Sequence, residues 1–289
     1  MEIVTTVAEV RQAVRAARQA GRPVTFVPTM GALHVGHLEL MKQAKAGAEL
    51  GQVGEPFVVV SIFVNPTQFG PGEDYLAYPR DLATDAAQTQ SVGVDLIFAP
   101  EVSEIYPPGD ATFVEVGRLT EGLCGPFRPG HFRGVATVVC KLFNIVQPNG
   151  AYFGEKDYQQ LKVIQRMVTD LRLPVQVVPV ATVREADGLA MSSRNAYLSA
   201  EERQAALKLS AGLRAAAARA NAGESSAQLL INEVRRMTAA EPLITLQYVE
   251  LRDAETLESL TMLDRPAVLA LAAQVGKARL IDNIILQVP

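Results

Sequence analysis

Two histidines stand three residues apart after a short apolar run, and they are the first sign of chemistry in the sequence. The segment PTMGALHVGH carries His34 and His37, which share one face of a helix if the helix has begun by that point. Gly31 and Gly36 allow the backbone to approach a ligand closely, and the free amides at a helix N-terminus bind phosphate. This pattern favours stabilisation of negative charge that develops on a phosphoryl group.

Two simpler interpretations of the histidine pair stay open. The first is a pair of partly exposed histidines at the start of a helix, without a ligand. The second is a zinc site. The sequence disfavours zinc because the histidines lack the i, i+4 spacing of metalloprotease helices, and because His131 is the only other histidine.

Neutral amide side chains follow the most apolar run of the chain. Asn65 and Gln68 lie in NPTQF, directly after PFVVVSIFV, where they could hold a substrate carboxylate or hydroxyl. Asn-Pro also begins ordinary turns, so this motif carries little weight alone. Farther along, Asp81, Asp85 and Gln88 share a helical face, which could bind magnesium through water but is more typical of a solvated helix surface.

Two later motifs combine cationic side chains with polar loops. In FGEKDYQQ, Lys156 could bind phosphate, Asp157 could bind a ribose hydroxyl, and Gln160 follows one turn later. An ordinary helix N-terminus with Asp157 as its cap is the alternative. In GLAMSSRN, two serines and Arg194 could bind a polyphosphate, and the alternative is a basic surface loop.

The order of apolar runs and helical stretches predicts the fold that positions these motifs. Strands and helices alternate through the first two-thirds of the chain, which predicts a doubly wound parallel sheet in a Rossmann-like α/β fold. The predicted strands are 24–27, 57–64, 95–99, 151–153 and 175–180, and the predicted helices are 36–46, 82–91, 134–146 and 161–171. Ligands of such sheets lie beyond the carboxyl ends of the strands, and the motifs fall there.

The composition changes after about residue 183. Helices are predicted at 200–221 and 225–240, followed by strands at 246–251, 267–273 and 278–288 without helices between them. This pattern predicts a smaller α+β domain with an antiparallel sheet. The expected domains are residues 1–183, which bind nucleotide and substrate, and residues 184–289, which form a smaller lid.

The composition of the 289-residue chain excludes several classes of protein. Hydrophobic residues make up 48% and charged residues 20%, which excludes a disordered chain. A net charge of −4 disfavours general binding to nucleic acid or to an anionic membrane. Only two cysteines and no visible leader or spanning segment predict a cytoplasmic protein. The sequence also lacks GxGxxG and the P-loop pattern, which disfavours a dehydrogenase or a P-loop NTPase.

Taken together, the motifs resemble a known enzyme family. The order PTMGALHVGH, SIFVNPTQF, YPRD, RPGHFRGV, FGEKDYQQL and DGLAMSSRN is similar to that of pantothenate synthetase, also called pantoate–β-alanine ligase, over most of residues 24–198. This family belongs to the nucleotidyltransferases that share an HxGH signature with class I aminoacyl-tRNA synthetases. The resemblance implies a ligase that uses ATP to join pantoate to β-alanine through a pantoyl adenylate. It also implies Mg²⁺ with ATP and a homodimer, and it leaves the metal ligands unknown.

The resemblance assigns roles to matching positions. His37 matches the catalytic residue, assigned as a proton donor, and His34, Lys156 and Arg194 are expected to act with it on the phosphates. The implied ATP-binding residues are Met30, Gly31, Ala32, Leu33, His34, Val35, Gly36, His37, Gly154, Glu155, Lys156, Asp157, Val183, Met191, Ser192, Ser193 and Arg194.

Two glutamines complete the implied site. Gln68 matches a ligand shared by pantoate and β-alanine, and Gln160 matches a second pantoate ligand. Two other functions stay open. One is a nucleotidyltransferase of the same fold that acts on another acid or on an alcohol, and the other is a nucleotide-binding module without turnover.

Overall fold

A computed structural model describes residues 1–51 and 54–288, which form two compact units. The first unit consists of Met1–Val116, Arg128–Glu155 and Val163–Ala181, and the second consists of Gly117–Phe127, Lys156–Lys162 and Thr182–Pro289. The predicted domain boundary at residue 183 stays a prediction, and residue 289 lies outside the described residues.

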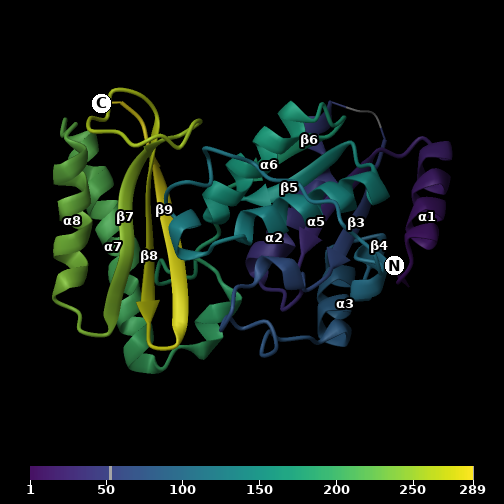
Figure 1. Cartoon of the computed structure of the whole chain (residues 1–289), viewed down its shortest axis with the longest axis horizontal. Helices are drawn as coiled ribbons and strands as arrows, with labels where there is room; N and C mark the ends of the chain where they lie inside the picture. The colour runs from purple at the N-terminus through teal and green to yellow at the C-terminus, as the bar shows by residue number, and fades with distance from the viewer. Residues whose placement is uncertain (52–53, 289) are drawn as a thin grey trace. The chain divides into compact units, whose positions relative to one another are not determined.

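The first unit is built on a six-stranded parallel sheet (Figure 1). The strand order is β1-β4-β3-β2-β5-β6, which confirms the predicted α/β fold. The strands are β1 (Glu2–Val4), β2 (Val24–Thr29), β3 (Phe57–Ile62), β4 (Leu96–Phe98), β5 (Gly150–Gly154) and β6 (Gln176–Val180). The helices along this part of the chain are α1 (Val7–Gln19), α2 (Val35–Ala46), α3 (Leu82–Ser91), α4 (Val102–Ile105), α5 (His131–Val146) and α6 (Tyr158–Asp170). Short 3-10 turns include η2 (Pro66–Gln68) and η4 (Glu155–Asp157).

Helices cover both faces of this sheet, as two neighbouring residues of β2 show. Val27 packs with Met41 of α2 in one buried cluster. The ring of Phe26 lies 6.4 Å from the ring of Phe143 in α5, measured between centroids. Since successive side chains of a strand point to opposite faces, α2 and α5 lie on opposite faces of the sheet. Burial on both faces explains why these strands are continuous apolar runs.

Most element boundaries differ from the predictions by one to three residues, and two of these differences have a clear local cause. Helix α5 begins at His131 and not at residue 134, because Gly130 takes the left-handed conformation with φ of +79° and starts the helix without a side-chain cap. Strand β3 ends at Ile62 and not at residue 64, just before the chain turns at Asn65 into η2.

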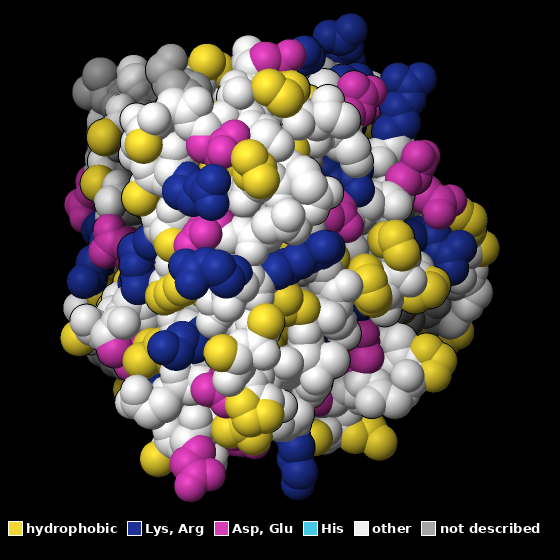
Figure 2. Space-filling view, turned by 90° about the vertical axis from the view of Figure 1, so that its left-hand side faces the viewer, with side chains coloured by type: hydrophobic (Ala, Val, Ile, Leu, Met, Phe, Trp, Pro, Cys, Tyr) yellow, Lys and Arg dark blue, Asp and Glu magenta, His cyan; other side chains and the backbone are white. Residues whose placement is uncertain are grey.

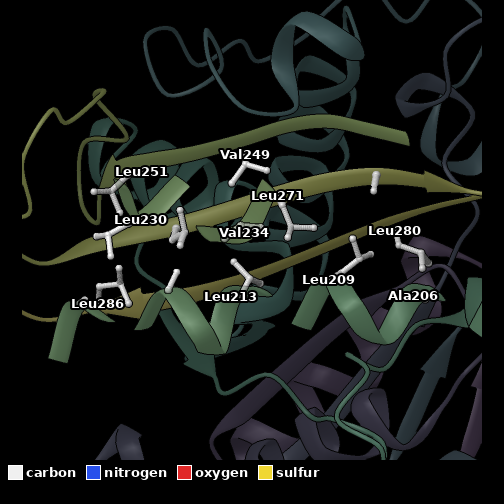
Figure 3. Packing of buried hydrophobic residues seen from close by; sticks show 14 of the residues in the cluster. Ala206, Leu209, Leu213, Leu230, Val234, Val249, Leu251, Leu271, Leu280 and Leu286 are labelled. Carbon is white, nitrogen blue, oxygen red and sulfur yellow. The ribbon is translucent and has the colours of Figure 1, made fainter. Parts of the chain in front are cut away.

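The second unit is an antiparallel sheet with two helices, which confirms the predicted α+β pattern. Its strands follow the order β7-β8-β9, and its elements are α7 (Ala200–Asn221), α8 (Ala227–Ala239), β7 (Ile244–Asp253), β8 (Ala267–Val275) and β9 (Ala278–Leu286), with the 3-10 turn η5 (Ser193–Tyr197) before α7. Figure 3 shows the buried cluster that joins both helices to the sheet, through Ala206, Leu209, Leu213, Leu230, Val234, Val249, Leu251, Leu271, Leu280 and Leu286.

The face of the second unit that carries α8 has a mixed charge. Figure 2 shows basic and acidic side chains interspersed there. Glu233 of α8 lies 2.6 Å from a guanidinium nitrogen of Arg236 and 3.4 Å from one of Arg219 in α7. Ion pairs at the surface contribute little to stability, and the charge in this view is of both signs, unlike that of a nucleic-acid surface. Within the described ranges, no helix combines the length and the apolar character needed to span a membrane.

Candidate active site

The turn between β2 and α2 has a strained backbone that a buried carboxylate holds in place. Gly31 has φ of +80° and Ala32 has φ of +51°, in a region that alanine rarely adopts. The carboxylate of Asp85 in α3 accepts hydrogen bonds from the amides of Ala32 at 3.1 Å and Leu33 at 2.9 Å. Asp85 therefore fixes the backbone that leads into α2.

The position of Asp85 corrects the sequence analysis. The sequence favours a solvated helix surface at this position, and that interpretation is wrong for Asp85, which is only 3% exposed. Burial raises the pKa of the Asp85 carboxyl, although the hydrogen bonds from the amides of Leu33 and Ala32 act in the opposite direction. A Cβ at Gly31 would lie 2.7 Å from Oδ2 of Asp85, so this close approach also requires a glycine.

The two histidines hold the start of α2 through their own side chains. His34 is the N-cap of the helix, and its Nδ1 accepts a hydrogen bond from the amide of Gly36 at 3.1 Å. Nδ1 of His37 accepts from the amide of His34 at 3.3 Å, and the two ring centroids are 4.0 Å apart. Because each Nδ1 accepts, each neutral ring carries its proton on Nε2. The start of α2 thus holds two Nε2–H donors at the positive end of a helix, where negative charge is stabilised.

Gln68 lies against the turn that begins this segment. Its Nε2 donates to Sδ of Met30 at 3.1 Å, and its Oε1 accepts from Nδ2 of Asn65 at 3.1 Å. Asn65 is 1% exposed, and its Oδ1 accepts from the amide of Thr67, which fixes the start of η2. The first unit therefore places Gln68 in contact with the predicted ATP-binding segment.

The backbone of Gln68 is held by a second group of residues. Nδ1 of His131 lies 2.8 Å from the carbonyl oxygen of Gln68, and Nη2 of Arg128 donates to the same oxygen at 3.3 Å. Nε of Arg128 donates to Oε1 of Glu73 at 2.7 Å. Burial alone would raise the pKa of Glu73, but the hydrogen bonds and charge of Arg128 lower it below its ordinary value. These interactions fix Gln68 on both its side-chain and its backbone atoms.

Lys156 lies between β5 and α6, within η4. Its side chain is 20% exposed, and its Nζ is 3.7 Å from Oδ2 of Asp157. The carbonyl oxygen of Lys156 accepts a hydrogen bond from Nδ2 of Asn283 in β9 at 3.0 Å. A partly exposed ammonium group on a fixed backbone is suited to binding phosphate oxygens.

The two adjacent glutamines of α6 have different roles. Gln159 is buried, and its side chain bonds three backbone groups, namely the amide of Cys124 and the carbonyl oxygens of Leu119 and Gly122. Gln160 is half-buried and makes no side-chain hydrogen bond with the residues that the structure describes. Gln159 is therefore structural, whereas the amide of Gln160 can bind a ligand.

The segment from Val183 to Arg194 folds back on itself in the second unit. The amide of Met191 donates to the carbonyl oxygen of Val183 at 3.0 Å, and Arg184 pairs with Ala190 in an isolated antiparallel bridge. Oγ of Ser192 accepts from the amide of Arg194 at 3.3 Å, which begins η5. The fold therefore brings the predicted ATP-binding residues at both ends of this segment together.

Each unit thus assembles part of the predicted site. The first unit holds Met30–His37, Gln68, Gly154 and Glu155, and the second holds Lys156, Asp157, Gln160, Val183 and Met191–Arg194. Among residues 1–51 and 54–288, no group of three or more His, Cys, Asp or Glu side chains is arranged to hold a metal ion.

Sequence reasoning missed two polar residues in β9. Asp282 is 4% exposed and Asn283 is 7% exposed, although they stand in the largely apolar strand ARLIDNIIL. Oδ1 and Oδ2 of Asp282 accept from both terminal nitrogens of Arg184, at 2.9 Å and 2.7 Å. The sequence did contain one signal, which is the polar pair Asp282 and Asn283 within an apolar strand. A carboxylate buried in such a strand requires a partner elsewhere in the fold.

Comparisons with known proteins agree along the whole chain. The family model described as pantoate-beta-alanine ligase matches residues 2–285. The pantothenate synthetase of Pelotomaculum thermopropionicum is 56% identical over 286 residues, which cover 99% of each chain.

Two solved structures support the same assignment. The pantothenate synthetase of Thermus thermophilus has a TM-score of 0.89 and 50% identity, over 98% of this chain and 99% of that one. The pantoate-beta-alanine ligase of Francisella tularensis, solved with beta-gamma ATP and beta-alanine, has a TM-score of 0.79 and 35% identity, over 99% of this chain and 97% of that one. Because the fold, the histidine motif and the family match over residues 2–285 agree, the chain belongs to the pantoate-beta-alanine ligase family.

Proposed function

We propose that this chain uses ATP to condense pantoate with β-alanine, giving pantothenate, AMP and pyrophosphate through a pantoyl adenylate. The observation that carries the proposal is the family match over residues 2–285. The Francisella tularensis relative, solved with beta-gamma ATP and beta-alanine, supports these two compounds as substrates.

The first half-reaction activates the carboxylate of pantoate. A carboxylate oxygen attacks the α-phosphorus of ATP, and the bond from that phosphorus to the pyrophosphate oxygen breaks. Negative charge on the phosphates is stabilised by the Nε2–H groups of His34 and His37 and by the cations of Lys156 and Arg194. The bonds from backbone amides to both Nδ1 atoms support this role, because they aim the donors before ATP binds.

The second half-reaction forms the amide bond. The amine of β-alanine attacks the acyl carbon of the adenylate, and AMP leaves as the C–O bond breaks. Gln68 and Gln160 bind pantoate through their side-chain amides. The interactions that fix Gln68, and the unpaired amide of Gln160 among the described residues, support these assignments.

Mg²⁺ is proposed as the metal that accompanies ATP, where it offsets the charge of the triphosphate. The carboxylate of Asp85 already binds two amides, and the described residues hold no cluster of metal ligands. An Mg²⁺ ion that entered with ATP would then be held by the phosphate oxygens and by water. A homodimer stays a prediction from the family resemblance, and a cytoplasmic location stays a prediction from the composition of the sequence.

Exchange of labelled pyrophosphate into ATP tests the proposal. The purified chain should catalyse exchange when pantoate is present, and β-alanine should not be required, because only the first half-reaction is reversed. Addition of β-alanine should then release AMP and form pantothenate.

Other outcomes would identify other functions. Exchange that depends on a different acid alone would indicate another nucleotidyltransferase of this fold. Tight binding of ATP without AMP release in the presence of both substrates would indicate a nucleotide-binding module.

A further inference from the structure

Asp282 and Asn283 are buried neighbours in β9, and each holds a different segment of the predicted ATP site. Both are polar residues in a strand paired with the apolar strand β8, where Leu271 and Ala270 stand opposite them. Burial of a carboxylate and an amide is unfavourable unless their hydrogen-bonding groups are paired. The identity of their partners therefore indicates why polar residues stand here.

Asn283 holds the backbone of Lys156. Its Nδ2 donates to the carbonyl oxygen of Lys156 at 3.0 Å, although the two residues are 127 positions apart in the chain. A fixed carbonyl restricts rotation of the peptide, and this sets the direction in which the Lys156 side chain leaves the backbone. Asn283 itself is fixed because its backbone N–H donates to Oδ1 of Asp282 at 2.8 Å.

Asp282 holds the segment that leads to Arg194. Both of its carboxylate oxygens bond Arg184, whose Nη1 also donates to the carbonyl oxygen of Gly188 at 3.2 Å. Nη2 of Arg184 donates in addition to the carbonyl oxygen of Asn283 at 3.3 Å. Because Arg184 pairs with Ala190, just before Met191 and Ser192, these bonds fasten the start of the Arg194 loop to β9.

We propose that Asp282 and Asn283 are positioning residues. They fix Lys156 and the loop that carries Arg194 to the same strand, β9, so that both cations can bind the triphosphate. The inference rests on the proposed function, since it takes both cations to be phosphate ligands. Neither Asp282 nor Asn283 is expected to touch ATP. Asn283 acts through Lys156, and Asp282 acts through Arg184 and the loop that carries Arg194.

Equilibrium binding of ATP to variants of the full chain tests this coupling. Asn283→Ala should weaken ATP binding about tenfold, the size of one lost hydrogen bond. The same substitution made in a Lys156→Ala chain should have little further effect, because the residue that it positions is already absent. A purely structural role would instead weaken binding by the same factor in both chains, and this result would overturn the proposal.

A second cycle tests the other half of the pair. Asp282→Asn should weaken ATP binding in the wild-type chain but not in an Arg194→Ala chain. Equal effects in the two chains would overturn the role of Asp282. Gln274→Ala is the matched control, because this amide of β8 also donates to a backbone carbonyl, that of Gly276 at 3.0 Å, and should leave ATP binding unchanged.

Thermal unfolding of each variant separates positioning from loss of the fold. If Asn283→Ala does not fold, Asn283→Leu keeps the size of the side chain without a charge and removes the donor, and it should give the same dependence on Lys156. A wild-type chain that binds ATP but shows no pantoate-dependent exchange would contradict the proposed function and leave this coupling in place. A wild-type chain that does not bind ATP would contradict both.

Discussion

Gly134 of α5 lies so close to Thr67 of η2 that a Cβ at the glycine would be 2.3 Å from the carbonyl oxygen of Thr67. Nδ2 of Asn65 also donates to the carbonyl oxygen of Gly134 at 3.2 Å. The helix and the turn are therefore packed backbone against backbone. The position of Gln68, the next residue after Thr67, depends on the absence of a side chain at Gly134.

Gly134→Ala should impair pantoate use even though alanine favours a helix by about 1 kcal/mol over glycine. The added methyl group must displace Thr67 and Gln68, and small displacements of binding groups lower activity by about tenfold to 100-fold. Pantoate-dependent pyrophosphate exchange should show a raised KM for pantoate. Gly117→Ala is the control, because nothing lies within 4 Å of a Cβ there. Equal KM values for both variants would contradict this explanation.

His37→Ala should lower turnover by roughly 10² to 10³, the usual effect of removing one donor that stabilises developing charge. His37→Asn separates this role from capping, because its Oδ1 can still accept from the amide of His34 while the Nε2–H is absent. Both variants should lose turnover, and only His37→Ala should also lose stability in thermal unfolding. Near-normal rates for His37→Asn would show that the ring acts through the backbone alone.

Asp85 of α3 and Asp81, the N-cap of this helix, should make contributions to stability that change in opposite directions with pH. Burial raises the pKa of Asp85 above its ordinary value of 3.8, whereas the amide of Thr84 lowers the pKa of exposed Asp81 below 3.8. Just above pH 3.8, native Asp85 keeps a proton that the unfolded chain releases, so its contribution to stability falls as the pH rises. Below pH 3.8, native Asp81 stays ionised while the unfolded chain binds a proton, so its contribution falls as the pH drops.

Urea unfolding of the wild type, Asp85→Asn and Asp81→Asn between about pH 3 and 6 measures these contributions. As the pH rises, the free energy of unfolding of the wild type should fall relative to that of Asp85→Asn. Over the lower part of the range, the free energy of unfolding of the wild type should rise relative to that of Asp81→Asn as the pH rises. Slopes of the same sign would show that one of the two environments is wrongly described.

Leu230→Ala should lower the free energy of unfolding by about 2 to 5 kcal/mol, the usual effect of opening a cavity in a core. Leu230 of α8 is fully buried in the cluster between α7, α8 and the sheet (Figure 3). Its neighbour Leu229 is 44% exposed, so Leu229→Ala should change stability by less than about 0.5 kcal/mol. Urea unfolding followed by circular dichroism compares the two, and equal losses would contradict the packing described for α8.

The sequence predicts an element best where the chain shows its cap. Helices α3 and α7 begin at the predicted residues, because Asp81 and Ser199 stand directly before them and accept from backbone amides of the first turn. Helix α5 has no such signal at Gly130, and its predicted start lies too late in the chain. A side chain that caps a helix can be recognised in the sequence. A helix start that depends on the positive φ of a glycine cannot.

In the candidate site, too, the sequence predicts local features better than contacts between distant segments. The histidine pair at the start of α2 could be found from spacing alone, since both the helix and the capping bonds are local. Asp85, His131 and Asn283 could not, because each acts on a segment that only the fold brings near. The hydrogen bond from Nδ1 of His131 to Gln68 joins residues 63 positions apart, and no spacing rule predicts such a contact.

The bonds made by Nδ1 of His34 and His37 limit what these rings can do with a proton. Passing a proton through an imidazole requires one nitrogen to receive it while the other releases it. Here one nitrogen of each ring is already bonded to a backbone amide, so a proton arriving there would break the cap of α2. Each ring is therefore arranged to donate a hydrogen bond from Nε2, and a ring that acted as a relay would lose the bond by which it caps α2.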